Sequence, residues 1–425
     1  MIGEWKDTEI SLFPSEWDCG CLLDIASKDK KAIISGPFGS NISRKFFVDE
    51  GVPVIRGNNL SLDISQRFID NEFVYVTEEK AEELNTWAQA DDLVFTAAGT
   101  IGQVGILSHK QKYEAYIISN KQLRVTVDPS KMLPIFAYYW FASNFMQDWI
   151  ASCDTGSTIP LINLTVLKSL PVPIPPLPEQ RAIASVLSSL DDKIDLLHRQ
   201  NKTLEAMAET LFRQWFVEEA DEEWKECTLN DLCIQIASGG TPSTKIKSYY
   251  NGDINWYSTK ELKDNFLYES ENKITKEGLN NSSAKLFPAG TVVIAIYAAP
   301  TVGRLGILAN EASFNQAACG LIANEEFCNP EFMYLYLKNQ RNELNSVASG
   351  SAQQNLNVGK IKSYPAFKVP KDLMDQFKDV IQPIFKKINS NTLQIRILEK
   401  LRDTLLPKLM SGEVRVEFAQ GEPAV

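Results

Sequence analysis

The strongest constraint on the fold is that the chain repeats itself. The segment TIGQVGIL at Thr100–Leu107 returns as TVGRLGIL at Thr301–Leu308, so these two copies are 201 residues apart. The spacing between matching positions drifts in this part of each copy, but from Gly156 and its match Gly350 onward it stays at 194 residues. Loops can therefore change length in the first part of each copy, whereas the last part keeps a fixed length. The sequence predicts two related globular domains, each followed by a segment of regular structure.

The fixed segment of each half has seam residues, mostly apolar, spaced alternately by four and three positions. This heptad pattern is typical of a helix in a coiled coil. In the first half the seam positions are Ile183, Leu187, Leu190, Ile194, Leu197, Asn201, Leu204, Ala208, Leu211 and Trp215. In the second half they are Phe377, Ile381, Ile384, Ile388, Asn391, Ile395, Leu398, Arg402, Leu405 and Leu409. The sequence therefore predicts one long helix at the end of each half, with one asparagine in each seam.

Prolines set limits on both helices. The run PVPIPPLPEQ at Pro171–Gln180 precedes the first helix and indicates where it starts, as Pro365 and Pro370 do for the second. Pro383 and Pro407 lie inside the second heptad pattern. A proline inside a helix removes one hydrogen bond and clashes with the preceding turn. We therefore expect a kink or an early end of the second helix there.

The two seams can pair in parallel or antiparallel. If they run antiparallel with aligned ends, the residue numbers of facing positions sum to 592, as for Trp215 and Phe377. Asn201 then faces Asn391. A buried asparagine is costly unless it meets a polar partner, and a matched pair in a seam fixes the register. We expect an antiparallel pair with these two side chains in contact; the alternative is that both lie on a solvated edge.

The remainder of each half is expected to be one α+β domain with its own core. Short β-rich runs such as Asp92–Gly99 and Thr291–Ala298 alternate with Gly, Asn and Pro turns, and helical stretches such as Pro134–Ser152 follow. The expected fold class is α+β, with two repeated α/β domains separated by an antiparallel two-helix coiled coil with pseudo-twofold symmetry. We expect globular domains over residues 1–170 and 217–365, long helices over 171–216 and 366–412, and a C-terminal tail over 413–425.

Composition excludes several classes of protein. Of the 425 residues, 44% are hydrophobic and 23% are charged, which is ordinary for a folded soluble protein. The longest apolar stretches fall well short of the roughly 20 residues that span a bilayer. The N-terminal residues include acidic ones where a secretory signal has a basic start, so we expect a cytoplasmic protein. Seven cysteines without framework spacing argue against a disulfide-rich secreted protein.

The chain also lacks the sequence signatures of catalysis. His109 and His198 are its only histidines, which argues against a zinc site and against histidine acid-base catalysis. The segment GPFGSNIS at Gly36–Ser43 lacks the lysine that an ATP-binding P-loop requires. We find neither a methyltransferase cofactor loop nor an acidic nuclease cluster. We therefore expect a chain that is not an enzyme and binds neither a metal nor a cofactor itself.

Several segments carry a resemblance to a known family. They are PLPEQRAIASVLSSLDDKIDLL at Pro176–Leu197, IASGGTPST at Ile236–Thr244, the two repeated elements, FNQ at Phe314–Gln316, and KLMSGEVRV at Lys408–Val416. Together with the doubled chain and the heptads, they resemble the DNA-specificity subunits of type I restriction-modification enzymes over essentially the whole chain. The second helix departs from this pattern with KDLMDQ at Lys371–Gln376, where the first has LPEQRA. Its methyltransferase-binding face is therefore less typical.

The resemblance implies both architecture and function. In that family each half is a target recognition domain followed by a conserved spacer helix, and the two helices pack antiparallel. The resemblance implies a non-catalytic subunit that reads a bipartite sequence in double-stranded DNA, one half-site per domain. It further implies assembly with two methyltransferase subunits, which bring S-adenosylmethionine, and with restriction motor subunits, which use ATP.

Polar, glycine-rich loops with a basic residue nearby are the candidates for contact with DNA. Base edges are read by Arg, Lys, Asn, Gln, Ser and Thr, and phosphates are held by Lys, Arg and loop amides. In the first half the candidates are Ser40, Asn41, Ser43, Arg44, Lys45, Arg56, Asn58, Asn59, Asn120, Lys121, Gln122, Ser157 and Thr158. In the second half they are Thr241, Ser243, Thr244, Lys245, Lys247, Thr259, Lys260, Thr301, Arg304, Asn315, Gln316, Ser351, Gln353 and Gln354. The alternative for any one of them is a turn that satisfies only its own backbone.

The overall charge limits how this chain would bind DNA. A net charge of -11 argues against tight binding by the isolated chain, because affinity comes largely from neutralised phosphates. We therefore expect partner subunits to supply many of the phosphate contacts. Unlike segments in the two halves suggest an asymmetric target. Two alternatives remain open: a coiled-coil scaffold that binds proteins but not DNA, and a self-sufficient nucleic-acid enzyme.

The long helices suggest how the two half-sites are spaced. The first seam, about 33 residues long, spans roughly 50 Å at about 1.5 Å per residue. We expect the helix pair to set the non-specific gap between the half-sites. Inserting one heptad in both helices should lengthen that gap without changing either half-site, as sequencing of the modified sites would reveal. An unchanged gap in a folded variant would contradict this role.

Overall fold

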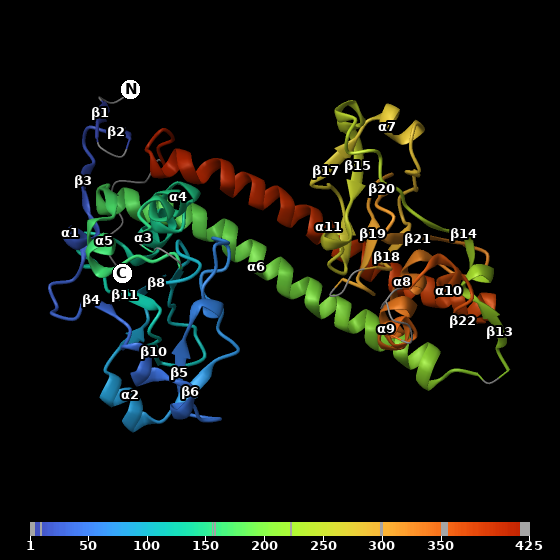
Figure 1. The fold of residues 1–425 in the computed structure, drawn as a ribbon, viewed down its shortest axis with the longest axis horizontal. Helices are drawn as coiled ribbons and strands as arrows, with labels where there is room; N and C mark the ends of the chain where they lie inside the picture. Colours follow the sequence, from blue (N-terminus) through green and yellow to red (C-terminus); the bar gives the residue numbers. More distant parts are fainter. Residues whose placement is uncertain are drawn as a thin grey trace. The chain divides into compact units, whose positions relative to one another are not determined.

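The computed structural model describes residues 5–8, 11–154, 156, 159–221, 223–297, 301–349 and 356–416. The chain divides into two compact units, Met1–Asp195 with Ile397–Val425, and Leu196–Arg396. One division falls inside α6 (Leu177–Arg213) and the other inside α11 (Lys371–Met410). Figure 1 shows these two long helices. Each half of the sequence therefore contributes to both units. None of the helices in the described residues combines the length and the apolar composition that a membrane span requires.

The first unit contains two four-stranded sheets. One has the order β4-β11-β8-β9, with β4 (Ile33–Ser35), β11 (Gln122–Val125), β8 (Leu93–Thr96) and β9 (Val104–Ile106). The other has the order β6-β5-β10-β7, with β6 (Val74–Val76), β5 (Val52–Ile55), β10 (Ala115–Ile118) and β7 (Trp87–Gln89). Strands β5 and β10 run parallel, and their other neighbours are antiparallel. All residues of β8 and β9 are buried, so this part of the sheet is covered on both faces.

Helices and two short strand pairs complete the first unit. The helices are α1 (Leu22–Ile25), α2 (Glu78–Leu84), α3 (Pro134–Phe141), α4 (Asn144–Ser152) and α5 (Leu164–Ser169). The strand pairs are β1 (Trp5–Asp7) with β2 (Leu12–Pro14), and β3 (Asp18–Cys21) with β12 (Pro171–Ile174). Helix α3 has a proline in its first turn, where the missing N–H costs nothing. One core cluster joins Phe95 of the sheet, Phe136 of α3, Leu187 of α6 and Leu409 of α11.

The second unit is built in a related way. Its larger sheet has the order β14-β21-β18-β19-β16, with β14 (Cys233–Ser238), β21 (Ala318–Ala323), β18 (Val292–Ala295), β19 (Leu305–Leu308) and β16 (Asn265–Leu267). Its smaller sheet has the order β17-β15-β20, with β17 (Asn272–Ile274), β15 (Tyr250–Tyr257) and β20 (Ser313–Phe314). Strand β13 (Lys225–Thr228) pairs with β22 (Pro365–Lys368). The shorter helices are α7 (Lys276–Asn280), α8 (Pro330–Asn339), α9 (Arg341–Ser349) and α10 (Val358–Lys362).

The repeat predicted from the sequence is present in the topology of the two units. In each unit the strand from the repeated element, β9 or β19, pairs antiparallel with the strand before it, β8 or β18. That strand in turn pairs antiparallel with β11 or β21. In each unit, the sheet that lacks the repeated element contains one parallel pair, β5 with β10 or β15 with β20. The expected α+β class with two repeated domains is therefore confirmed. The units differ at β16, where the first has only an isolated bridge between Ser61 and Val104.

The two long helices pair as the seam pattern predicts. Every predicted seam position is buried or partly buried. In the second unit, Asn391 Nδ2 donates to Asn201 Oδ1 at 2.9 Å, and the ring centroids of Trp215 and Phe377 lie 5.6 Å apart. Residues later in α6 therefore contact residues earlier in α11, so the helices are antiparallel there. Asn391 is 0% exposed, which rules out the alternative of a solvated edge.

The ends of the long helices differ in part from expectation. Helix α6 starts at Leu177 rather than at residue 171, because residues 171–174 form β12 and pair with β3. Neither Pro383 nor Pro407 ends α11, which continues to Met410. A proline inside a helix costs about 3 kcal/mol. We attribute the continuation of α11 through both prolines to the burial of apolar side chains next to them. Ile381 and Leu409, which flank the prolines, are almost fully buried, and each contributes about 1.5–3 kcal/mol.

Candidate nucleic-acid interface

The candidate loops of the first domain meet beside the ends of β5 and β11. Gly36 N donates to Gln122 O at 2.9 Å, and Ser119 N donates to Ile55 O at 2.9 Å. A Cβ at Gly36 would lie 1.7 Å from Ser119 O, so this crossing of two backbones requires glycine. The bonds bring together the segments Ser35–Lys45, Arg56–Asn59 and Asn120–Gln122.

Most of the candidate side chains in the first domain are accessible. Those of Ser40, Asn41, Arg44, Lys45, Asn58, Asn120 and Lys121 are exposed, and those of Ser43 and Arg56 are partly buried. Arg44 and Lys45 lie in one 3-10 turn, and the Lys45 ammonium is 4.7 Å from the ring centroid of Phe46. Exposed cations on a short turn are suited to contacting phosphates, while the neighbouring Ser and Asn side chains are suited to base edges.

Asn59 and Gln122, two of the predicted contact residues, are buried within the domain. Asn59 is 0% exposed, and its Nδ2 donates to Ile69 O at 3.0 Å and to Asn71 O at 2.9 Å. Gln122 is 1% exposed, and its Oε1 accepts from the Ser119 hydroxyl. In this structure these side chains bond to the loops and are not exposed to a ligand. Residue type alone cannot distinguish the two roles, since the same amide serves both.

The candidate loops of the second domain meet at the equivalent place. Gly240 N donates to Phe314 O at 2.9 Å, and Trp256 Nε1 donates to Gly240 O at 2.8 Å. Asn315 N donates to Tyr257 O at 2.9 Å. The bonds bring together the segments Ser238–Lys247, Ser258–Lys260 and Asn315–Gln316.

The candidate side chains of the second domain vary in their exposure, and Thr301 and Arg304 lie outside the three segments that the bonds join. Ser243, Thr244, Lys245, Lys247, Lys260 and Gln316 are exposed, and Thr241, Thr259, Thr301, Arg304 and Asn315 are partly buried. Lys260 Nζ lies 2.7 Å from Glu271 Oε2, so its charge is already paired within the domain. Thr241 donates its hydroxyl proton to Gln316 Oε1, which links two of the loops. The remaining candidates, Ser157, Thr158, Ser351, Gln353 and Gln354, lie outside the described residues.

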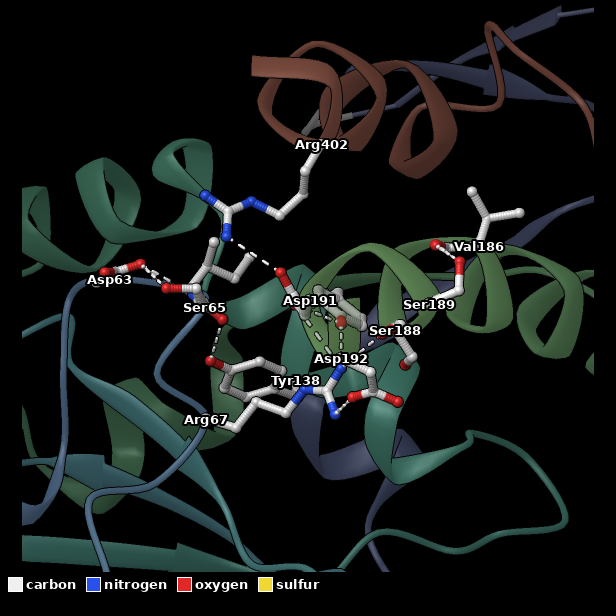
Figure 2. A network of polar contacts seen from close by, with 12 residues as sticks. Asp63, Ser65, Arg67, Tyr138, Val186, Ser188, Ser189, Asp191, Asp192 and Arg402 are labelled. Carbon is white, nitrogen blue, oxygen red and sulfur yellow. Dashed lines mark hydrogen bonds and ion pairs between the residues drawn. The ribbon is translucent and has the colours of Figure 1, made fainter. Parts of the chain in front are cut away.

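A buried ionic network connects the first domain to the long helices, as Figure 2 shows. Asp191 of α6 is the centre of this network: Arg402 Nη1 of α11 donates to it at 3.1 Å, and the Tyr139 hydroxyl of α3 donates to it at 2.6 Å. Arg67 Nη2 lies 3.7 Å from the same carboxylate, and Arg67 Nη1 lies 3.0 Å from Asp192. Burial raises the pKa of Asp191, and the hydrogen bonds from Tyr139 and Arg402 oppose that rise.

Arg67 gives this network its connection to the candidate interface. It follows the Arg56–Asn59 turn, whose Asn59 is bonded to the backbone at Ile69. The segment that carries the turn is therefore held to α6 by charge. The seam pattern placed Arg402 without a polar partner and did not identify Arg67 or Asp191. The charge of Arg402 at a seam position was the one signal that pointed to a buried acidic partner.

The second domain is held to its long helix at a comparable place. The Tyr268 hydroxyl donates to Asn389 O of α11 at 2.8 Å, and Arg396 Nη2 lies 2.7 Å from Glu269 Oε2. Both contacts come from the segment that follows the Ser258–Lys260 turn. In each unit, a polar anchor thus holds the segment behind one candidate turn against a long helix. Such anchoring limits how far the loops can move and favours a preformed binding surface.

Comparisons with known proteins agree with this arrangement. The chain matches the family described as type I restriction modification DNA specificity domain over residues 14–206 and 221–400. It is 26% identical to the type I restriction enzyme MjaIX specificity subunit of Methanocaldococcus jannaschii over 97% of each chain. It is also 26% identical to the HindI specificity subunit of Haemophilus influenzae, over 70% of this chain and 81% of that one. The S subunit of a type I restriction-modification system from M. genitalium shares the fold, with a TM-score of 0.60 and 16% identity over 95% of this chain and 97% of that chain.

Proposed function

The chain belongs to the type I restriction modification DNA specificity domain family, and we propose that it is the non-catalytic subunit that selects the DNA target of such an enzyme. Each globular domain reads one half-site of a bipartite sequence. The observation that carries this proposal is the pair of equivalent loop clusters. Each lies beside the parallel strand pair of its unit, β5 with β10 or β15 with β20. The first cluster exposes Ser, Asn, Lys and Arg side chains, and the second exposes Ser, Thr, Gln and Lys side chains.

An asymmetric target follows from the side chains at equivalent turns. The turn after β5 is Arg56-Gly-Asn-Asn59, whereas the turn after β15 is Ser258-Thr-Lys-Glu261. The first offers an arginine and an exposed asparagine, and the second offers a threonine and a lysine already paired with Glu271. Different donors and acceptors select different base edges. The two half-sites are therefore unlike.

The partners follow from the same proposal. Two methyltransferase subunits, which bind S-adenosylmethionine, and restriction motor subunits, which use ATP, supply the chemistry at the site that this chain selects. The assembly acts in the cytoplasm, where the DNA is. A scaffold that binds only proteins would leave the two clusters of polar loops without a function. We therefore favour a chain that recognises DNA.

Selection from a random DNA library by the complex of this chain with its methyltransferase tests the proposal. We expect enrichment of two short unlike motifs at a constant separation. If no motif is enriched while the protein complex remains intact, the scaffold alternative would be correct. The same library incubated with the methyltransferase alone is the control.

Replacing both Lys245 and Lys247 with alanine should weaken DNA binding by the complex without changing the motif. Each lysine that neutralises a phosphate contributes about 0.9 to the slope of log affinity against log salt concentration. We expect this slope to fall in magnitude by about 1–2. Fluorescence anisotropy over a salt series measures it, and Lys28→Ala, at an exposed position outside the candidate loops, is the matched control. An unchanged slope would remove this loop from the interface.

A further inference from the structure

The long helices carry two polar layers in an otherwise mostly apolar seam. In the second unit, Asn391 donates to Asn201 at 2.9 Å. In the first unit, Arg402 Nη1 lies 3.1 Å from Asp191 Oδ1, and both side chains are buried. A polar group in a seam is stable only when the facing residue completes its hydrogen bonds. The identity of the facing residue therefore matters at these two layers more than elsewhere in the seam.

The repeat places apolar residues at the positions equivalent to these polar ones. With the fixed spacing of 194 residues, Asp191 corresponds to Phe385, Arg402 to Ala208, Asn201 to Ile395 and Asn391 to Leu197. Ala208 and Phe385 share one buried cluster in the second unit and line the same small cavity. Leu197 and Ile395 are also buried. Each polar layer thus has an apolar counterpart one repeat away.

Side-chain size is distributed unevenly between the halves at these layers. Where Asp191 meets Arg402, and where Ala208 and Phe385 come together, the first half of the sequence supplies the smaller side chain and the second half the larger one. Cores tolerate neither an unfilled gap nor an overfilled space without a loss of stability. The two layers are complementary only when one partner comes from each half.

We propose that these layers make the two halves of the chain, residues 1–216 and 217–425, bind each other in preference to a second copy of themselves. Two first halves would set Asp191 opposite Ala208, which leaves a gap and removes Arg402. Tyr139 and Arg67 would remain with Asp191, since both belong to the first half. Two second halves would set Arg402 opposite Phe385, which overfills the layer. In either self-pair, asparagine faces leucine or isoleucine instead of asparagine.

The test uses the full chain, cleaved after folding. A site for a sequence-specific protease is inserted between Ala220 and Asp221, both exposed, and the folded protein is cut there. Heavy-isotope and light preparations are mixed at a urea concentration at which their halves exchange, and native mass spectrometry counts the pairs. We expect pairs of unlike halves to exceed self-pairs by more than about 100-fold, the scale set by losing a buried ionic partner. Self-pairs in statistical proportion would overturn the proposal.

A matched variant tests the asparagine layer directly. Asn201→Ile with Asn391→Leu copies the buried Leu197 and Ile395 pair, so it leaves no unpaired polar group and also suits a self-pair. We expect the variant to keep unlike pairs and to raise the fraction of self-pairs by about 10-fold or more. Gln394→Leu, an exposed position on α11, is the control that should change nothing. An unchanged fraction of self-pairs in the double variant would contradict the role of this layer. The inference does not depend on DNA reading, so it stands or falls separately from the proposed function.

Discussion

Replacing Asp191 with alanine is expected to lower the free energy of unfolding by about 3–5 kcal/mol, the range for breaking a buried ion pair. The change removes the partner of Arg402, which is only 5% exposed, and the acceptor for the Tyr139 hydroxyl. Arg402 would keep Asp403, which is 60% exposed and so gives a weaker, solvated contact. Urea denaturation of the full chain measures the loss.

Two controls separate this effect from the loss of any ion pair. Lys371→Ala breaks the exposed pair with Asp375 on the same long helix, and we expect it to cost no more than about 1 kcal/mol. Asp191→Leu with Arg402→Leu replaces both charges by apolar groups, and we expect it to recover much of the loss. If Asp191→Ala and Lys371→Ala cost the same, the network is not the anchor that we describe.

This network also marks the limit of what the seam pattern could predict. Periodicity placed Asn201 opposite Asn391 correctly, because a heptad and an antiparallel register together determine which positions face each other. The same register assigned Leu190, not Asp191, to face Arg402. The arginine side chain is long enough to reach the neighbouring position, where Tyr139 of another helix also donates. A pattern within one segment cannot show a partner that tertiary packing brings from another.

Replacing Gly36 with alanine is expected to abolish reading of the first half-site while leaving the second intact. The new Cβ would lie 1.7 Å from Ser119 O and 2.5 Å from Ser119 C, which are backbone atoms that cannot move alone. The loop carrying Ser40 to Lys45 must then shift away from the end of β11. We expect a loss of about 1–3 kcal/mol in unfolding free energy, and a further loss of about 1–3 kcal/mol in binding for each displaced base contact.

Gly57→Ala is the matched control for this prediction. A Cβ there would meet nothing closer than Gln103 Oε1 at 3.7 Å, which is an ordinary contact. Its unfolding free energy should change by less than about 1 kcal/mol. The affinities for DNAs that carry only the first or only the second half-site measure the two domains independently. Equal losses at both half-sites in Gly36→Ala would show a general folding defect rather than a displaced loop.

The candidate loops were predictable as segments but not residue by residue. Glycine beside Ser, Asn and basic residues identified the segment from Ser35 to Lys45, because backbone crossings require glycine and DNA contact requires polar side chains. Asn59 and Gln122 satisfied the same criteria, yet both are buried and bonded within the domain. Their burial arises from strands and turns distant in sequence, so no local pattern distinguishes them from the exposed Asn58 and Lys121.

The function that we propose for this chain is the selection of a bipartite, asymmetric DNA sequence for modification. Methylome sequencing of cells that express the chain with its cognate methyltransferase, compared with the methyltransferase alone, tests it most directly. We predict one new methylated motif, made of two unlike half-sites at a constant separation, in the cells that contain the chain. The absence of any new motif, with the protein complex still forming, would contradict the claim and leave a scaffold that does not read DNA.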